Sequence, residues 1–293
     1  MPTVTLTLDG SAPTPAALPR RLRLSRAATE LLAGTTGTPL PWGRTGPATD
    51  LAQALGGPVP AEAPGADAEH ELLTAGLVRP DGTVHPDVEA ALATFGRPEV
   101  FVDLTLSLAR GGHVDQLEAW HRLSGGRVTT LAATGGACEL AWYDVRWWHP
   151  ALTALAARPQ PDPTRPAPRP DLVLPLELML GSGHAHRTGR QDVLAELLGR
   201  YGDAVSADGR RLGDAETREE LRTLHDSTQG RLRVVVAGAE RRTLGLVSWV
   251  LFADGWRELE PRRAGGPPLV AVSPVRPEAL GARVARLVTA VRP

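Results

Sequence analysis

Two histidines separated by one residue are the strongest candidate for metal binding in this sequence. His184 and His186 lie in a glycine-rich stretch, residues 181–189 (GSGHAHRTG), which we expect to form a loop. Two imidazoles need at least one further ligand, and no carboxylate or histidine stands nearby at a ligand spacing. We therefore interpret the stretch as an exposed loop, and we predict no metal and no cofactor.

The only cysteine, Cys138, is the candidate nucleophile, with eight histidines as potential bases. It alternates with Leu140 and Trp142 along an expected strand, so the three side chains share one face and point inward. A buried thiol in apolar surroundings is unreactive. The chain also lacks a Gly-x-Ser-x-Gly elbow and a Gly-x-Gly-x-x-Gly turn after a strand. We predict that the protein is not an enzyme; an enzyme using His184, His186 or Cys138 is the weaker alternative.

Aromatic side chains form two clusters in the sequence that could stack on nucleic-acid bases. The clusters are Trp142, Tyr143, Trp147 and Trp148, and Trp249 and Trp256. Base stacking requires such rings to alternate with basic residues on one surface, and the formal net charge of the chain is only -1. We expect these rings to pack in the core or at a protein interface.

The composition excludes several classes of protein. All 32 positive charges are arginine, so a phosphate-binding loop and Schiff-base chemistry both lack their lysine. One cysteine excludes intramolecular disulfides and thiolate-rich zinc sites. Residues 1–9 alternate threonine with valine or leucine, which predicts a short strand and not a signal peptide. We expect a soluble cytoplasmic protein that binds neither nucleic acid nor membrane.

The second half of the chain has the clearest pattern of strands and helices. We predict strands over residues 232–237, 244–253, 256–260 and 269–272, with Asp254 and Gly255 forming a hairpin turn. A helix follows from Pro277, because Leu280, Val284 and Val288 recur at helical spacing. Further helices are expected over residues 191–201 and around Leu221 and Leu224, and residues 172–180 should run from strand to helix.

The first half shows a similar order of elements. We predict a helix over 22–32, an irregular connection over 34–64, a helix over 69–75 and another from Pro86. Strands over 99–108, 127–134 and 137–145 and a helix from Pro150 follow. Both halves thus read as helix, about three strands and helix.

A proline-rich segment separates the two halves. Residues 158–170 contain six prolines, which favour an extended, semi-rigid connection. We therefore divide the chain into residues 1–157, a connector over 158–170, and residues 171–293, and we expect one compact domain overall.

Several stretches of the sequence resemble one known family. Residues 71–86 read ELLTAGLVRPDGTVHP and run into Val88, Ala91 and Leu92 and then RPEVFVDL at 97–104. The DGW at 254–256, the VSP at 272–274, the C-terminal amphipathic helix, and residues 24–32 with PLP at 39–41 are similar too. In these stretches the sequence resembles the EspG family of type VII (ESX) secretion systems.

The resemblance implies a fold and a function. EspG proteins have an α+β fold, a central antiparallel sheet flanked by helical bundles with a quasi-two-fold internal repeat. They are cytosolic chaperones that bind the helical tip of PE–PPE secretion substrates, keep them soluble and direct them to their own system. The proline-rich connector and the histidine-bearing stretch depart from the family pattern, so a WxG-type helical substrate stays open. A non-enzymatic structural or adaptor protein is the alternative.

In that family the partner docks against the sheet and the C-terminal helical bundle. The resemblance transfers no short binding motif, so as a hypothesis we place partner binding on apolar residues of the second-half helices. Ordinary core packing is the competing explanation for each of them. The residues are Leu176, Met179, Leu180, Leu194, Leu197, Leu198, Leu221 and Leu224.

Overall fold

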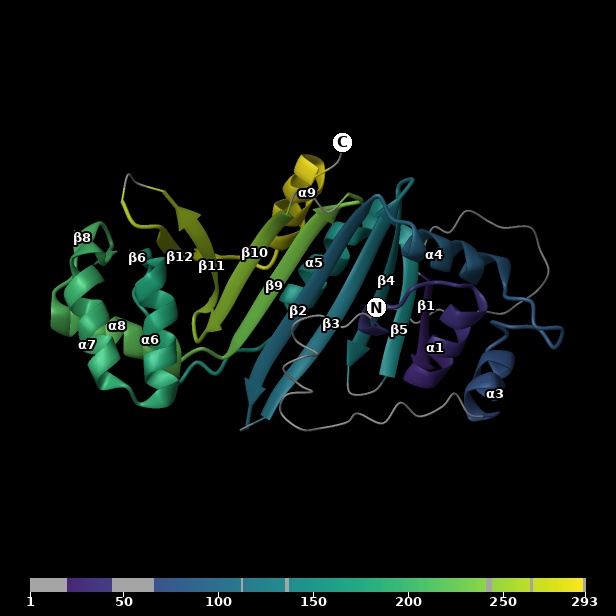
Figure 1. Cartoon of the computed structure of the whole chain (residues 1–293), viewed down its shortest axis with the longest axis horizontal. Coiled ribbons are helices and arrows are strands. Elements are labelled where there is room, and N and C mark those ends of the chain that lie inside the picture. The colour runs from purple at the N-terminus through teal and green to yellow at the C-terminus, as the bar shows by residue number, and fades with distance from the viewer. Residues whose placement is uncertain are drawn as a thin grey trace.

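One antiparallel sheet runs through both halves of the chain (Figure 1). The computed structural model describes residues 20–43, 66–111, 113–134, 137–240, 244–263 and 266–291. In this part of the chain twelve strands pair in the order β1-β5-β4-β3-β2-β9-β10-β11-β12-β6-β7-β8. Helices and antiparallel strands are mixed, so the protein has an α+β fold.

Two antiparallel meanders meet at the centre of the sheet. The first comprises β2 (Val100–Arg110), β3 (His113–Ser124), β4 (Arg127–Thr134) and β5 (Ala137–Asp144), with β1 (Arg20–Ser25) on its outer edge. The second comprises β9 (Gly230–Gly238), β10 (Leu244–Phe252), β11 (Gly255–Arg262) and β12 (Leu269–Val275), followed outward by β6 (Leu172–Pro175), β7 (Ser206–Ala207) and β8 (Arg210–Arg211). Strands β2 and β9 join the meanders, with Leu104 opposite Val234.

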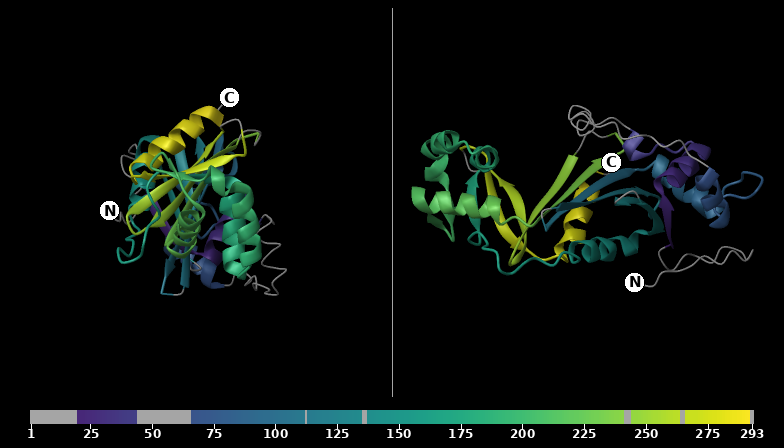
Figure 2. Two further views of the ribbon diagram at one scale, coloured as in Figure 1. Left: turned by 90° about the vertical axis from the view of Figure 1, so that its left-hand side faces the viewer. Right: turned by 90° about the horizontal axis from the view of Figure 1, so that it is seen from below.

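The helices occupy three places around the sheet. Figures 1 and 2 show α1 (Arg26–Thr35), α3 (Ala66–Thr74) and α4 (Pro86–Gly96) at one end, and α6 (Leu176–Thr188), α7 (Gln191–Tyr201) and α8 (Asp214–Asp226) at the other. Between them, α5 (Trp148–Ala156) and α9 (Ala279–Val291) pack against each other. None of these described helices combines the length and the apolar character needed to cross a membrane.

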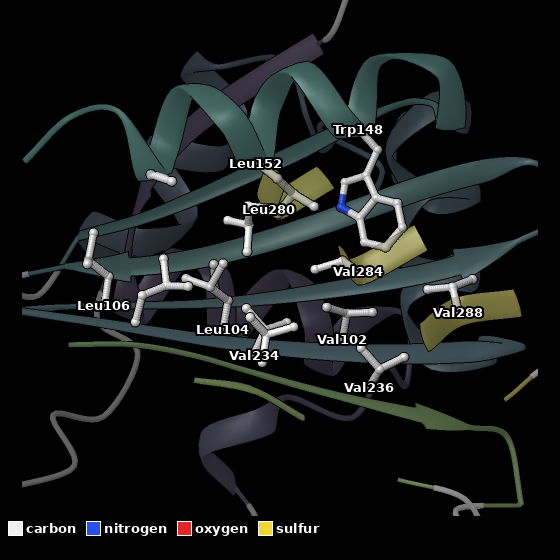
Figure 3. Packing of buried hydrophobic residues seen from close by; sticks show 14 of the residues in the cluster. Val102, Leu104, Leu106, Trp148, Leu152, Val234, Val236, Leu280, Val284 and Val288 are labelled. Carbon is white, nitrogen blue, oxygen red and sulfur yellow. The ribbon is translucent and has the colours of Figure 1, made fainter. Parts of the chain in front are cut away.

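The central core lies between the sheet and the α5–α9 pair (Figure 3). Val102, Leu104 and Leu106 of β2 project from alternate positions toward Trp148 and Leu152 of α5, and all five are at most 4% exposed. On α9 the buried side chains are those of Leu280, Val284, Val288 and Val291, beside the buried Gly281, which confirms the helical periodicity of the C-terminal sequence. Two further clusters lie under the helices at the two ends.

The helix predicted over 22–32 is wrong in its first part. Residues Arg20–Ser25 form β1, which pairs with β5 so that Leu24 lies opposite Cys138. Leu22 and Leu24 alternate with arginines, a period of two that suits a strand. The helix starts only after Ser25, whose Oγ accepts a hydrogen bond from the main-chain N–H of Ala28 at 3.1 Å.

The first meander contains a strand that the sequence pattern did not predict. Strand β3 fills the interval between the first two strands predicted in this half, so the first meander has four strands, as the second has, and not the predicted three. Its inward positions include Ala119 and His121, and its first residues are exposed, so its apolar alternation is weak.

The loop predicted over 181–189 is also wrong, because α6 continues to Thr188. A Cβ on Gly181 would lie 2.6 Å from Cδ1 of Leu197, and one on Gly183 would lie 3.0 Å from Cε1 of His225. Glycine at these two positions therefore lets α6 approach α7 and α8 closely. Gly189, with φ of 69°, ends the helix in the left-handed conformation.

The remaining predictions concern the N-terminal residues, the proline-rich connector and the tryptophans. The strand expected within residues 1–9 and most of the irregular connection over 34–64 lie outside the described residues. The proline-rich residues 158–170 contain neither helix nor strand, as predicted. Trp148, Trp249 and Trp256 are buried, which confirms core packing for these rings, whereas Trp147 is 36% exposed.

Candidate partner-binding surface

Within the part of the chain that the structure describes, the face of the sheet opposite α5 and α9 is open at its centre. Thr105 lies opposite Arg233, which lies opposite Ser248, and these side chains alternate with the buried ones that face α5 and α9. Arg231 and Arg233 are exposed, and Leu246 is 56% exposed. We call this surface the open strip; its residues are Asp103, Thr105, Ser107, Arg231, Arg233, Val235, Leu246 and Ser248.

The open strip carries positive charge. Within the described residues, Arg231 and Arg233 make no ion pair, whereas Asp103 is paired with Arg122 at 2.6 Å between Oδ1 and Nη1. The exposed Leu246 can contact an apolar side chain of a partner, and the guanidinium groups of Arg231 and Arg233 can bind its carboxylates or carbonyl oxygens.

A hollow of about 200 Å³ continues the open strip toward the C-terminal helices. Met179, Leu180 and Arg187 of α6 line one side, and Arg231 and other sheet residues line the floor. Leu180 is 61% exposed, whereas Leu178 on the same helix is fully buried. Helices α6 and α8 therefore meet the sheet at an apolar groove that is open to solvent.

The structure divides the eight predicted partner-binding residues by burial. Leu198, Leu221 and Leu224 are 2–5% exposed and belong to the core under the C-terminal helices. Leu176, Met179, Leu194 and Leu197 are partly buried against the same core. Only Leu180 of the eight is well exposed, although Met179 and Leu224 line the same hollow.

Leu194 and Leu221 line a second hollow, on the side of α8 where Ser182 and His186 lie.

The sequence interpretation missed Arg231, Arg233 and Leu246. The pattern that could have identified the two arginines is the alternation of arginine with apolar residues along β9, because it leaves one face of a central strand charged.

The histidines of α6 do not form a metal site. His184 is exposed, and Nε2 of His186 lies 2.6 Å from Oδ1 of Asp226 on α8. Residues two apart on a helix point in different directions, so the two imidazoles cannot converge. Among the described residues, no group of three or more His, Cys, Asp or Glu side chains could hold a metal ion.

A serine and a histidine lie in contact beneath these residues. Oγ of Ser182 is 2.8 Å from Nε2 of His225, and the His225 ring stacks 6.0 Å from that of His186. Burial, followed by the charges of His186 and nearby arginines, lowers the pKa of His225 to about 4, so this imidazole is neutral at neutral pH. Ser182 is 1% exposed, so the pair holds α6 against α8 and offers no accessible nucleophile.

Cys138 is buried, as its strand pattern predicted. It is 3% exposed and packs with Leu24 and Leu140. Burial raises the pKa of its thiol, which disfavours the reactive thiolate.

Comparison with known proteins agrees with this architecture. A sequence model of the EspG family matches residues 55–286. Among solved structures, the chain is similar to the Mycobacterium tuberculosis type VII secretion system chaperone EspG5, solved in complex with a PE25–PPE41 dimer. The TM-score is 0.56 and the identity 14%, covering 93% of this chain and 97% of that chain, a likeness that shows the fold. A search of curated proteins found no match.

Proposed function

The chain belongs to the EspG family, and on that premise we propose that it is a cytosolic specificity chaperone of a type VII secretion system. It binds a helical secretion substrate of the PE–PPE type, keeps it soluble and directs it to its own system. The similar EspG5 chaperone was solved bound to a PE25–PPE41 dimer, which supports this choice of substrate class. The function requires no catalytic group and no cofactor.

One observation carries the proposal: an exposed leucine of α6 lies beside a groove that reaches the open strip. The tip of an amphipathic substrate helix exposes apolar side chains that would otherwise aggregate. Laid between α6 and β9, such a tip covers Leu180 and Leu246. Arg231, which belongs to the open strip and also lines the groove beside α6, then binds main-chain carbonyls or carboxylates of the tip. Burying a leucine contributes about 2 kcal/mol, enough to anchor a reversible contact.

We further propose that the molecule is a quasi-two-fold repeat with one helical bundle at each end. The order helix, four strands, helix occurs as α4, β2–β5, α5 and again as α8, β9–β12, α9. The turn before each unit supports the correspondence. The N–H of His85 donates to the carbonyl of Leu77 across Asp81-Gly82, and the N–H of Leu212 donates to that of Val205 across Asp208-Gly209.

Co-purification tests the proposed function. Each PE–PPE-type pair encoded in the same genome is co-expressed with this chain, and complexes are resolved by size exclusion. We expect a stable complex with at least one pair, and Leu180→Asp should weaken it tenfold or more. Leu73→Asp is the matched control, because Leu73 is an exposed leucine on α3 at the other end of the sheet.

The outcomes separate the alternatives. Binding lost equally in Leu180→Asp and Leu73→Asp would show that the groove is not the docking site. If WxG-type substrates bind and PE–PPE pairs do not, the substrate class changes and the chaperone role stands. If the folded chain binds neither class, the adaptor interpretation replaces the chaperone.

A further inference from the structure

A hollow of about 330 Å³ lies between α5 and the neighbouring face of β3, β4 and β5, away from the proposed docking surface. Small side chains make up much of its wall. The alanines on that wall include Ala119, Ala132, Ala141, Ala151 and Ala154. Its volume is within the range of small-molecule sites in proteins, which are mostly apolar with a few polar groups.

The register of the sheet explains why this hollow exists. Leu104 of β2 and Val234 of β9 pair at the centre of the sheet and occupy equivalent positions in the two meanders. The next strand places Ala119 of β3 opposite Leu104, but Val247 of β10 opposite Val234. Two residues further along β3 the first meander has His121, and at the corresponding position of β10 the second meander has Trp249. The first meander therefore carries the smaller side chain at both positions, which leaves space under α5.

His121 lines this hollow, and its imidazole carries a hydrogen-bond donor that has no partner among the described residues. Nε1 of Trp148 donates to its Nδ1 at 3.3 Å, and Oγ1 of Thr130 lies 2.7 Å from the same nitrogen. An indole N–H can only donate, so Nδ1 is the acceptor and the proton of the neutral ring is on Nε2. This Nε2 is buried and has no partner among the described residues. Burial lowers the pKa of His121 to about 3, which keeps the ring neutral.

The exposed part of the wall is positively charged. Arg23 and Arg158 line it, are exposed, and make no ion pair within the described part of the chain. A third lining arginine, Arg21, is paired at 3.0 Å with Glu139, the only carboxylate among the described residues that line the hollow. Two guanidinium groups therefore remain to bind an anion at the entrance.

We propose that this hollow binds an amphipathic organic acid. The carboxylate lies between Arg23 and Arg158, the apolar body lies against the alanines, and an oxygen at the far end accepts the hydrogen bond from Nε2 of His121. The ligand thus gives an acceptor to a buried donor that has none among the described residues, and a buried donor without an acceptor destabilises the folded state. The site is independent of partner binding at the open strip.

Calorimetric titration of the full chain tests the proposal with three probes. The probe ω-hydroxydecanoate has both oxygen ends, decanoate lacks the distal hydroxyl, and decanol lacks the carboxylate. We expect ω-hydroxydecanoate to bind about fivefold tighter than decanoate, and decanol at least tenfold more weakly than decanoate. An absence of saturable binding of ω-hydroxydecanoate to the folded protein would overturn the proposal.

Variants locate the two ends of the ligand. Arg23→Ala with Arg158→Ala should weaken both acids at least tenfold, whereas Arg286→Ala, an exposed arginine of α9, should change neither. His121→Phe should remove the preference for the hydroxy acid and leave decanoate binding within about twofold. Ala154→Phe should fill the hollow and abolish binding. Acid binding that is unchanged in the double arginine variant would place the ligand elsewhere and refute the site.

Discussion

The indole Nε1 of Trp256 on β11 donates a hydrogen bond to the main-chain carbonyl oxygen of Ala156, the last residue of α5, at 2.8 Å. The bond joins the second meander to the helix that follows the first, across 100 residues of sequence. Trp256 is 4% exposed, and its ring centroid is 6.2 Å from that of Trp249. The two halves therefore share one core and should unfold together.

We expect Trp256→Phe to lower the free energy of unfolding by about 2 kcal/mol. The variant leaves the carbonyl of Ala156 buried without a donor and removes part of a packed ring. Chemical denaturation followed by circular dichroism measures the change. Trp147→Phe is the control, because Trp147 is 36% exposed, and its effect should stay within about 0.5 kcal/mol. Two separate transitions in the wild-type protein would contradict the shared core.

Two glycines within helices should respond to alanine with opposite signs. A Cβ on Gly281 of α9 would lie 2.9 Å from Cβ and 3.2 Å from Cα of His149, so Gly281→Ala should force α9 away from α5. We expect a loss of about 1–3 kcal/mol. Gly199 of α7 has no atom within 4 Å of its ideal Cβ, so Gly199→Ala should stabilise the protein by up to about 1 kcal/mol. Thermal unfolding distinguishes the two, and equal effects would refute the close approach of α9 to α5.

Buried histidines should make the protein less stable in acid. The pKa of His121 is lowered to about 3 and that of His225 to about 4, mainly by burial. Below pH 6.5 the unfolded chain takes up protons that the folded state does not, so stability is full above that pH and falls as the pH decreases. Between pH 7 and pH 5 we expect His121 to account for about 2 kcal/mol, and the half-buried His225 for less.

Unfolding midpoints measured from pH 7 to pH 5 check this expectation. His121→Phe should flatten the dependence, whereas His113→Phe, at the exposed start of β3, should leave it unchanged. A dependence as steep in His121→Phe as in the wild type would contradict the assignment of His121.

The start of α1 depends on one side chain. Oγ of Ser25 accepts a hydrogen bond from the N–H of Ala28, so Ser25→Ala should cost about 1 kcal/mol. Ser25→Thr retains a hydroxyl acceptor and should recover most of that stability. A loss in the threonine variant as large as that in alanine would show that the hydroxyl does not cap the helix.

Local patterns in the sequence determined much of the second meander. Val284 and Val288 recur at helical spacing, and two apolar runs flank an Asp-Gly pair, so α9 and the β10–β11 hairpin follow from neighbours in the chain. The turn itself lies one residue earlier than predicted, because its two residues are Ala253 and Asp254 and Gly255 already pairs with Phe252. The burial of Cys138 followed in the same way from its alternation with Leu140. In such cases the pattern and the tertiary contacts favour the same structure.

The tertiary structure alone decided the elements whose residues contradict local preference. Gly181 and Gly183 suggest a loop, yet both lie within α6. Leu197 and His225 from other helices occupy the space that a Cβ would need, so these two glycines are required by the packing of the helices. Strand β3 carries a buried histidine whose partners, Thr130 and Trp148, come from β4 and α5.

The sequence alone could not identify the candidate surfaces, because tertiary packing decides which side chains remain exposed. All eight leucine and methionine positions proposed for partner binding have the same apolar character, and only packing separates the exposed Leu180 from the core residues Leu198, Leu221 and Leu224. Arg231 of β9 and residues of α6 meet at one groove because strands and helices distant in sequence pack together. Sequence determined which side chains could bury apolar surface, and the fold decided which of them were left facing solvent.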